Sequence, residues 1–227
     1  LIYTAKNGAK ISSNSWAAYS SLNIQTLRNA IALCESYGQL VVFAAANDGM
    51  DIDCAKHCAG VAVPQPATYE NPCLFVVAAT TRTDAIASFS NYGIETVDIA
   101  APGSVVLSTY PLAKNTGGYT SLSGTSMACP HVAGAAALLL SNNPTLSSDQ
   151  IKFVLMDAAD RIPSLSGKVI SGRLTAGGVW DTPVAVEQIP VPPVVDLSKY
   201  DVQGRIAPAD RSGVTFQKGK KKRVRVK

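Results

Sequence analysis

The residues most able to do chemistry form one run, Gly124–Gly134, which reads GTSMACPHVAG. Ser126 stands at the start of a long apolar stretch that predicts a buried helix, and a glycine two residues before it permits a close approach. A helix N-terminus offers unpaired N–H groups and a positive partial charge, which suit a nucleophile whose substrate becomes an oxyanion. A serine that only caps a core helix would give the same local pattern. The helix signals alone therefore do not distinguish a nucleophilic serine from an N-cap serine.

The run resembles the serine motif of the subtilase family, Gly-Thr-Ser-Met-Ala-x-Pro-His-Val-Ala-Gly. Every fixed position is matched, and Cys129 occupies the variable one. The resemblance implies that Ser126 is the nucleophile of a serine endopeptidase that hydrolyses peptide bonds through an acyl-enzyme. It also implies that His131, one turn into the helix, is a structural residue and not the catalytic base.

A second match ends at Asn47, which closes an apolar run and precedes an Asp-Gly pair. The segment Ala44–Gly49 resembles the subtilase strand that ends in Ala-Ala-Gly-Asn-x-Gly. By that resemblance the Asn47 amide donates a hydrogen bond to the oxyanion, together with the backbone N–H of Ser126. Ala46 replaces the usual glycine and is expected only to tighten the local backbone. Taken alone, Asn47 would be an ordinary turn asparagine.

Two short segments are expected to flank the substrate. By resemblance to subtilases, one pairs with the substrate backbone and walls the first specificity pocket, while the other forms the opposite wall. Recognition would then depend on main-chain hydrogen bonds to an extended peptide that is added as a strand. The first wall consists of Ser15, Trp16 and Ala17, and the second of Ala44, Ala45 and Ala46.

The partners that Ser126 needs are not recognisable in the sequence, because a serine nucleophile requires a base and an orienting carboxylate. Subtilases carry them in the chain order Asp, His, Ser, with the histidine in a His-Gly-Thr motif. The histidines here are His57 and His131, and neither has that context. The catalytic Asp and His are therefore expected upstream of Leu1, so the chain is interpreted as a fragment that is inactive, or nearly so, by itself.

The elements that must position these residues alternate between apolar strands and helices. Continuous apolar runs are typical of strands buried on both faces of a parallel sheet. The alternation indicates an α/β fold, which the resemblance makes a subtilisin-like three-layer fold with a mostly parallel sheet flanked by helices. Strands are predicted over residues 9–16, 40–46, 74–80 and 96–100, and a loop or insertion over 48–66. Helices are predicted over 22–37 and 126–142, and a last helix follows a capping box of Ser147 and Gln150.

The resemblance covers residues 1–182, which form the expected partial catalytic domain. Four prolines between positions 183 and 193 mark a linker, so residues 183–227 are expected to be a poorly ordered tail. The net charge of +4 reflects the run Lys218–Lys227, which holds seven basic residues and no aromatic one. This run predicts a solvated terminus and no nucleic-acid site. No apolar stretch approaches the roughly 20 residues of a membrane span.

No metal site is assigned from the sequence. Cys54, His57 and Cys58 offer only half of the paired ligands that a structural zinc site needs, so a disulfide or free thiols is the preferred interpretation. Subtilases often bind structural calcium, and Asp48, Asp51 and Asp53 lie close together, but no calcium ligand is assigned. The reaction itself requires no cofactor.

The resemblance further implies a polypeptide substrate, a propeptide or protein inhibitor as a second partner, and secretion. Two other classes of protein remain open. An α/β-hydrolase esterase would need Gly-x-Ser-x-Gly, but Ala128 stands where the second glycine belongs. A non-catalytic binding module built on a pseudo-protease would lack the base altogether.

Overall fold

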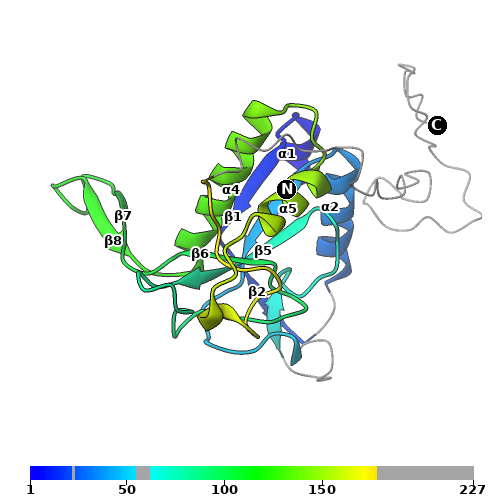
Figure 1. The fold of residues 1–227 in the computed structure, drawn as a ribbon. Helices are drawn as coiled ribbons and strands as arrows, with labels where there is room; N and C mark the ends of the chain where they lie inside the picture. Colours follow the sequence, from blue (N-terminus) through cyan, green and yellow to red (C-terminus); the bar gives the residue numbers. More distant parts are fainter. Residues whose placement is uncertain (22–23, 55–61, 178–227) are drawn as a thin grey trace, which may run out of the picture.

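The computed structural model describes residues 1–21, 24–54 and 62–177. Its centre is a parallel sheet with the strand order β1–β3–β5–β6, covered by two helices on each face (Figure 1). The predicted three-layer α/β fold is thereby confirmed. The strands are β1 (Ile11–Asn14), β3 (Leu40–Ala44), β5 (Leu74–Thr80) and β6 (Ile99–Pro102), and the helices are α1 (Ile2–Lys6) and α2 (Gln25–Ser36) on one face and α4 (Thr125–Asn142) and α5 (Ser148–Asp157) on the other.

Strands β3 and β5 are buried along their whole length. Successive side chains of a strand point to opposite faces of the sheet. Val42 and Ala44 accordingly pack in the cluster with α4 and α5, whereas Val41 and Phe43 pack in the cluster with α2. Two apolar clusters therefore lie on the two faces, which explains why these strands read as continuous apolar runs.

The start of α5 follows the sequence signal closely. The Ser147 hydroxyl accepts a hydrogen bond from the backbone N–H of Gln150, and the Gln150 side chain accepts one from the backbone N–H of Ser147. These two bonds satisfy donors that the first turn of a helix would otherwise leave unpaired. The predicted capping box is confirmed.

Two predicted boundaries are wrong. The strand expected over residues 96–100 begins only at Ile99, because the Thr96 hydroxyl donates to Asp53 and the Asp98 carboxylate accepts from the backbone of β5. The stretch 48–66, expected to be a loop, includes β4 (Val63–Gln65), which pairs antiparallel with β2 (Ala18–Ser20). The middle of that stretch and the expected tail after residue 182 lie outside the described residues.

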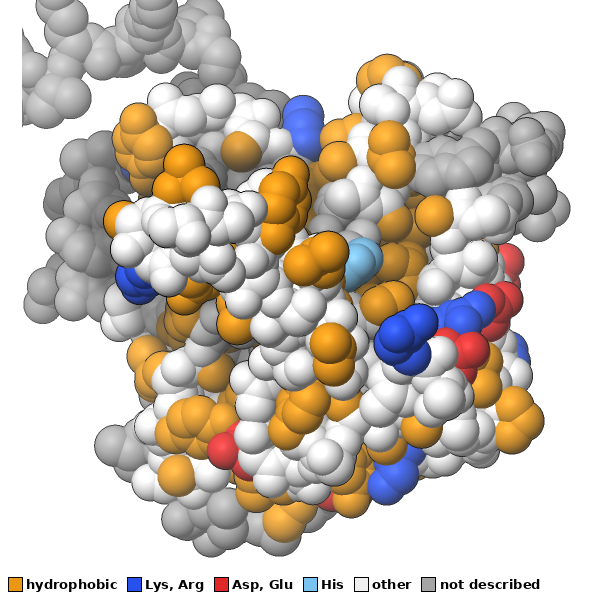
Figure 2. All heavy atoms as spheres, turned by 90° about the vertical axis from the view of Figure 1, so that its left-hand side faces the viewer, with side chains coloured by type: hydrophobic (Ala, Val, Ile, Leu, Met, Phe, Trp, Pro, Cys, Tyr) orange, Lys and Arg blue, Asp and Glu red, His pale blue; other side chains and the backbone are white. Residues whose placement is uncertain are grey.

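The segment between β6 and α4 forms a hairpin that the sequence did not indicate. Strands β7 (Val106–Thr109) and β8 (Tyr119–Leu122) pair antiparallel and project from the body of the molecule (Figure 1). Helix α4 was expected to be buried all round, but one side of it is exposed, including Leu138. Figure 2 shows hydrophobic side chains spread over this face, with a group of charged side chains at the right and others scattered elsewhere.

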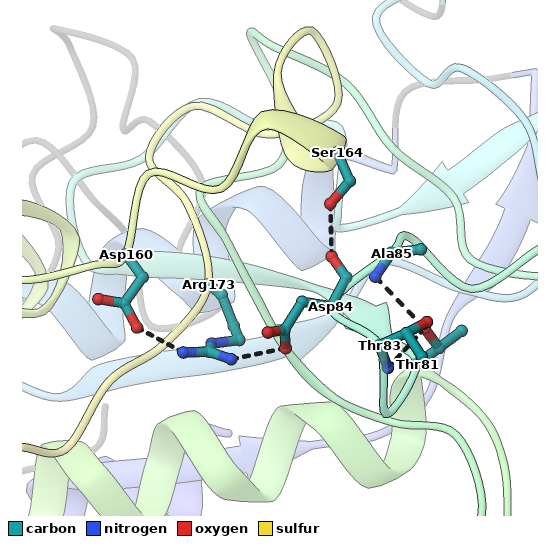
Figure 3. A network of polar contacts seen from close by, with 7 residues as sticks. All are labelled: Thr81, Thr83, Asp84, Ala85, Asp160, Ser164 and Arg173. Carbon is teal, nitrogen blue, oxygen red and sulfur yellow. Dashed lines mark hydrogen bonds and ion pairs between the residues drawn. The ribbon is translucent and has the colours of Figure 1, made fainter.

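Arg173 ties the end of the described chain to the sheet (Figure 3). Its guanidinium forms ion pairs with Asp84, at 2.6 Å, and with Asp160, at 2.5 Å. The backbones of Arg173 and Asp160 also exchange two hydrogen bonds of 2.9 Å. Ser164, in the short helix η1 (Pro163–Leu165), donates to the carbonyl of Asp84. The loop after β5 and the closing segment are thus held together.

None of the described helices is long and apolar enough to cross a membrane. The described cysteines fall into two groups. Cys54 is disulfide-bonded, whereas Cys34, Cys73 and Cys129 are buried free thiols. Burial raises the pKa of the Cys129 thiol, which keeps it protonated and unreactive.

Candidate active site

A pocket of about 200 Å³ lies at the carboxyl edge of the sheet, beyond the ends of β1 and β3. The carboxyl ends of parallel strands meet at one edge, and loops leaving that edge bring distant residues together. Helix α4 begins at the same place. The pocket is lined by Ser15, Trp16, Ala17, Tyr19, Ala44, Ala46, Asn47, Asp48, Thr125 and Ser126.

Ser126 is the second residue of α4, after Thr125, and Gly124 takes the N-cap position. Its side chain is half-buried. The hydroxyl lies 3.5 Å from the carbonyl oxygen of Ser15, which is a long and weak hydrogen bond. In return, the Ser15 hydroxyl donates to the Ser126 carbonyl at 2.9 Å. The Ser126 hydroxyl is therefore accessible at the pocket and is not used as a helix cap.

The Asn47 amide is oriented by its neighbour across the pocket. Its side-chain oxygen accepts the backbone N–H of Thr125 at 2.8 Å and lies 3.0 Å from the Thr125 hydroxyl. Because a backbone N–H only donates, it is the oxygen of Asn47 that faces Thr125, and the NH₂ group points elsewhere. Within the described residues this NH₂ group has no hydrogen-bond partner. It is a free donor next to the residue that precedes Ser126.

Ala46 holds a backbone conformation that suits glycine. Its φ of 73° lies in the left-handed region, which costs a residue with a Cβ roughly 1–2 kcal/mol. The buried Asn91 holds the turn in place, since its N–H donates to the Ala46 carbonyl and its side chain donates to the carbonyl of Ala45. The Asn91 side-chain oxygen also accepts the backbone N–H groups of Asp48 and Met50. The replacement of glycine thus introduces strain, beyond the tightening expected from the sequence.

One of the expected wall residues does not line the pocket. Ala45 is fully buried and packs in the cluster on the α2 side of the sheet, because it alternates with Ala44 and Ala46. The other expected wall residues, Ser15 to Ala17 with Ala44 and Ala46, do face the pocket. Trp16 is fixed by an edge-to-face contact with Phe43, with ring centroids 4.9 Å apart.

The described histidine does not serve Ser126. His131 is exposed, and its Nδ1 lies 2.7 Å from the carbonyl oxygen of Met127, in the preceding turn of the same helix. His57 lies outside the described residues. Within residues 1–21, 24–54 and 62–177, the Ser126 hydroxyl contacts a single polar group, the Ser15 carbonyl, and no base.

Sequence reasoning missed three residues that shape the site. Thr125 orients Asn47, and Asn91 holds the turn after β3 in place. The partner of each residue could be identified only in three dimensions. Tyr19 donates a hydrogen bond to the Asp48 carboxylate across the pocket. Burial, followed by this contact with Asp48, raises the pKa of Tyr19 to about 12.

The three aspartates considered for calcium are engaged separately. Asp48 accepts from Tyr19 and Asn91. Asp51 accepts the backbone N–H of Asp53, and the Asp53 carboxylate accepts backbone N–H groups from Ile94 and Glu95. In the part of the chain that the structure describes, no group of three acidic, histidine or cysteine side chains gathers in a way that could hold a metal ion. These carboxylates therefore do not form a common ligand set.

Solved structures share this fold. The protease domain of PatA after self-cleavage matches with a TM-score of 0.64 and 30% identity, covering 78% of this chain and 63% of that one. A lanthipeptide protease matches with a TM-score of 0.68 at 23% identity, over 79% of this chain and 64% of the other, which shows the fold alone.

Sequence relatives give the family. Thermitase of Thermoactinomyces vulgaris is 39% identical over 176 residues, which cover 78% of this chain and 56% of thermitase. Subtilisin BL of Lederbergia lenta is 42% identical over 139 residues, covering 61% of this chain and 45% of that protein. The chain thus spans about half the length of these curated relatives. The model of the subtilase family matches residues 1–187, and the chain belongs to this family of serine proteases.

Proposed function

We propose that this chain carries the nucleophile and the oxyanion site of a serine endopeptidase. Ser126 attacks the carbonyl carbon of the scissile peptide bond and forms an acyl-enzyme. The Asn47 side chain and the backbone N–H of Ser126 stabilise the negative charge on the carbonyl oxygen. Family membership removes the α/β-hydrolase esterase from consideration.

The orientation of Asn47 carries this proposal. Two contacts from Thr125 engage its oxygen, so its NH₂ group is fixed as a donor before any substrate arrives. A donor held in place in advance needs no reorganisation when charge develops, and this is what makes an oxyanion site effective. An ordinary turn asparagine would instead bond to its own backbone a few residues away.

The proton of the Ser126 hydroxyl must pass to a base and then to the leaving amine. We assign the base and its orienting carboxylate to a histidine and an aspartate outside this chain, as in the triad order of the family. On this proposal, the described residues alone retain only the weak activity of an oxyanion site without a base.

The substrate is a polypeptide bound in an extended form, with the Ser15–Ala17 segment on one side and the Ala44 and Ala46 wall on the other. Groups of the main chain, such as the Ser15 carbonyl beside Ser126, would bond to the peptide backbone. A propeptide or a protein inhibitor would occupy the same groove. The proposal also includes that the protein is secreted and that peptide hydrolysis requires no cofactor.

A fluorophosphonate probe tests the nucleophile directly, because it reacts only with an activated serine. We expect the full-length protein, with the proposed histidine and aspartate present, to be labelled at Ser126. The variant Ser126→Ala loses both labelling and peptide hydrolysis. Ser141→Ala, the same substitution at an exposed position of the same helix, is the matched control and keeps both. Labelling that survives Ser126→Ala would refute the assignment.

The second candidate is a non-catalytic module that binds peptides. It is favoured by one observation, the absence of a base beside the Ser126 hydroxyl within the described residues. A full-length protein that binds an extended peptide, but neither reacts with the probe nor cleaves the peptide, would support this candidate over the endopeptidase.

A further inference from the structure

Two side chains meet across the rim of the Ser126 pocket. Tyr19, from β2, donates its hydroxyl hydrogen bond to the carboxylate of Asp48, which follows Asn47 in the turn after β3. The Asn91 amide supports the same carboxylate at 3.1 Å. Asp48 and Tyr19 both line the pocket that contains Ser126. The carboxylate therefore stands inside the substrate site and not on an unrelated surface.

The charged residue that lines this pocket is acidic, and no basic residue of the described chain lines it. Asp48 contributes a carboxylate, and none of the other lining residues is a lysine, arginine or histidine. Its carboxylate contacts only neutral donors, Tyr19 and Asn91, within the part of the chain that the structure describes. A negative charge without a cationic partner beside a substrate site attracts a positive group.

The shape of the pocket fits a long side chain with a charged end. Ala44 and Ala46 give one wall small, apolar side chains, and Trp16 gives the other a flat aromatic surface. Lysine and arginine side chains lay their apolar stems along such surfaces while the charged end reaches a polar partner. Their ammonium or guanidinium groups form charge-assisted hydrogen bonds with a carboxylate, which are stronger than the bond that a neutral hydroxyl makes.

We propose that Asp48 makes this pocket select lysine or arginine as the residue on the amino side of the scissile bond, and that Tyr19 competes for the same carboxylate. This proposal rests on the proposed function, because Ser126 and Asn47 fix which carbonyl is attacked and thereby which side chain enters the pocket. In the free enzyme Tyr19 covers the carboxylate. A cationic side chain displaces the Tyr19 hydroxyl or shares the carboxylate with it.

The test measures kcat/KM of the full-length protein on peptides that differ only at this residue, which is lysine, arginine, leucine or phenylalanine. We expect lysine and arginine to be preferred. Asp48→Asn keeps the shape and removes the charge, and is expected to lower the lysine-to-leucine ratio by about tenfold or more. Tyr19→Phe frees the carboxylate and raises that ratio. Asp157→Asn, at the exposed end of α5, changes the net charge equally and leaves the ratio unchanged.

A binding arm separates failure of this inference from failure of the proposed function. The same labelled peptides are titrated into full-length Ser126→Ala, with and without Asp48→Asn, at low and high salt. Tighter binding of the lysine peptide, lost with Asp48→Asn and weakened by salt, supports the charged pocket even if no peptide is ever cleaved. If leucine or phenylalanine peptides bind as well as lysine peptides, and Asp48→Asn changes nothing, the inference is wrong even in an active protease.

Discussion

Two hollows lie at the same carboxyl edge of the sheet and differ in how their polar groups are used. The first, of about 200 Å³ beyond β1 and β3, contains Ser126 and Asn47. The second, of about 360 Å³ beyond β5 and β6, is lined by Thr80, Pro102 and Arg173, among others. The larger hollow has no nucleophile poised in it, so neither size nor position at the sheet edge identifies the active site.

The difference lies in which polar groups a substrate could reach. The polar atom of the second hollow that lacks a partner among the described residues, the Thr80 hydroxyl, is buried. In the second hollow, two carboxylates hold the Arg173 guanidinium and raise its pKa above the ordinary value (Figure 3). In the first, among residues 1–21, 24–54 and 62–177, the Asn47 NH₂ group has no hydrogen-bond partner and the Ser126 hydroxyl makes only a weak bond. Groups that are held in place but not neutralised are available to a substrate, whereas groups that neutralise one another stabilise the fold.

The largest expected effect is on catalysis in the first hollow. Asn47→Ala in the full-length protein removes the proposed oxyanion donor and is expected to lower kcat on the order of 10²–10³-fold with little change in KM, the magnitude known for the oxyanion asparagine of a subtilisin. Steady-state kinetics measure it. Asn142→Ala, at the exposed end of α4, is the control. A loss confined to KM would mean that Asn47 only binds substrate.

The second hollow is expected to respond in stability and not in activity. Arg173→Met removes both ion pairs, whose carboxylates are partly exposed, so the free energy of unfolding is expected to fall by about 1 kcal/mol. Urea unfolding measures it, and high salt should shrink the difference between variant and parent. A large fall in kcat for Arg173→Met at unchanged stability would break the contrast between the two hollows.

The smallest effect concerns Tyr19, a paired group at the rim of the first hollow. Its pKa in the folded protein, about 12, lies above the reference value of 10.0. Because the folded value is raised, the associated stability is present below pH 10 and is lost as the pH rises toward 12. Tyr19→Phe should therefore flatten the fall in unfolding free energy between pH 9.5 and 11.5, by less than about 1 kcal/mol, since Tyr19 is half-exposed.

That comparison uses urea titrations of the parent and of Tyr19→Phe at each pH. The contributions of the lysines and cysteines to the pH dependence are common to both proteins and cancel in the difference. Identical pH profiles would show that the contact with Asp48 contributes nothing. That result would also count against the inference that Tyr19 competes with a cationic substrate side chain for the Asp48 carboxylate.

The sequence predicted the fold well where the signal is local. The continuous apolar runs of β3 and β5 and the capping box of α5 each depend on residues within a few positions of one another. The strand at 96–100 was misplaced because Asp98 and Thr96 are held by partners more than 20 residues away. Such long-range hydrogen bonds leave no periodic pattern in the sequence.

The candidate site could be predicted only as far as its motifs extend. Ser126 and Asn47 were assigned from short runs, and the structure brings them to one pocket. The contact that fixes Asn47 joins it to Thr125 across 78 residues. Tyr19 and Asp48 meet only because β2 and the turn after β3 converge. Ala45 was assigned to the wall by resemblance, together with Ala44 and Ala46, although alternation along the chain turns its side chain away from the pocket.

Strand β1 has one hydrogen-bonded neighbour, β3, in the described sheet. Its other row of peptide groups has no strand partner within the described residues, and its residues are less buried than those of β3. A bare edge of this kind is a template on which any extended chain can pair. Preparations that consist of these residues alone are therefore expected to self-associate as concentration rises, so light scattering belongs before any kinetic measurement on them.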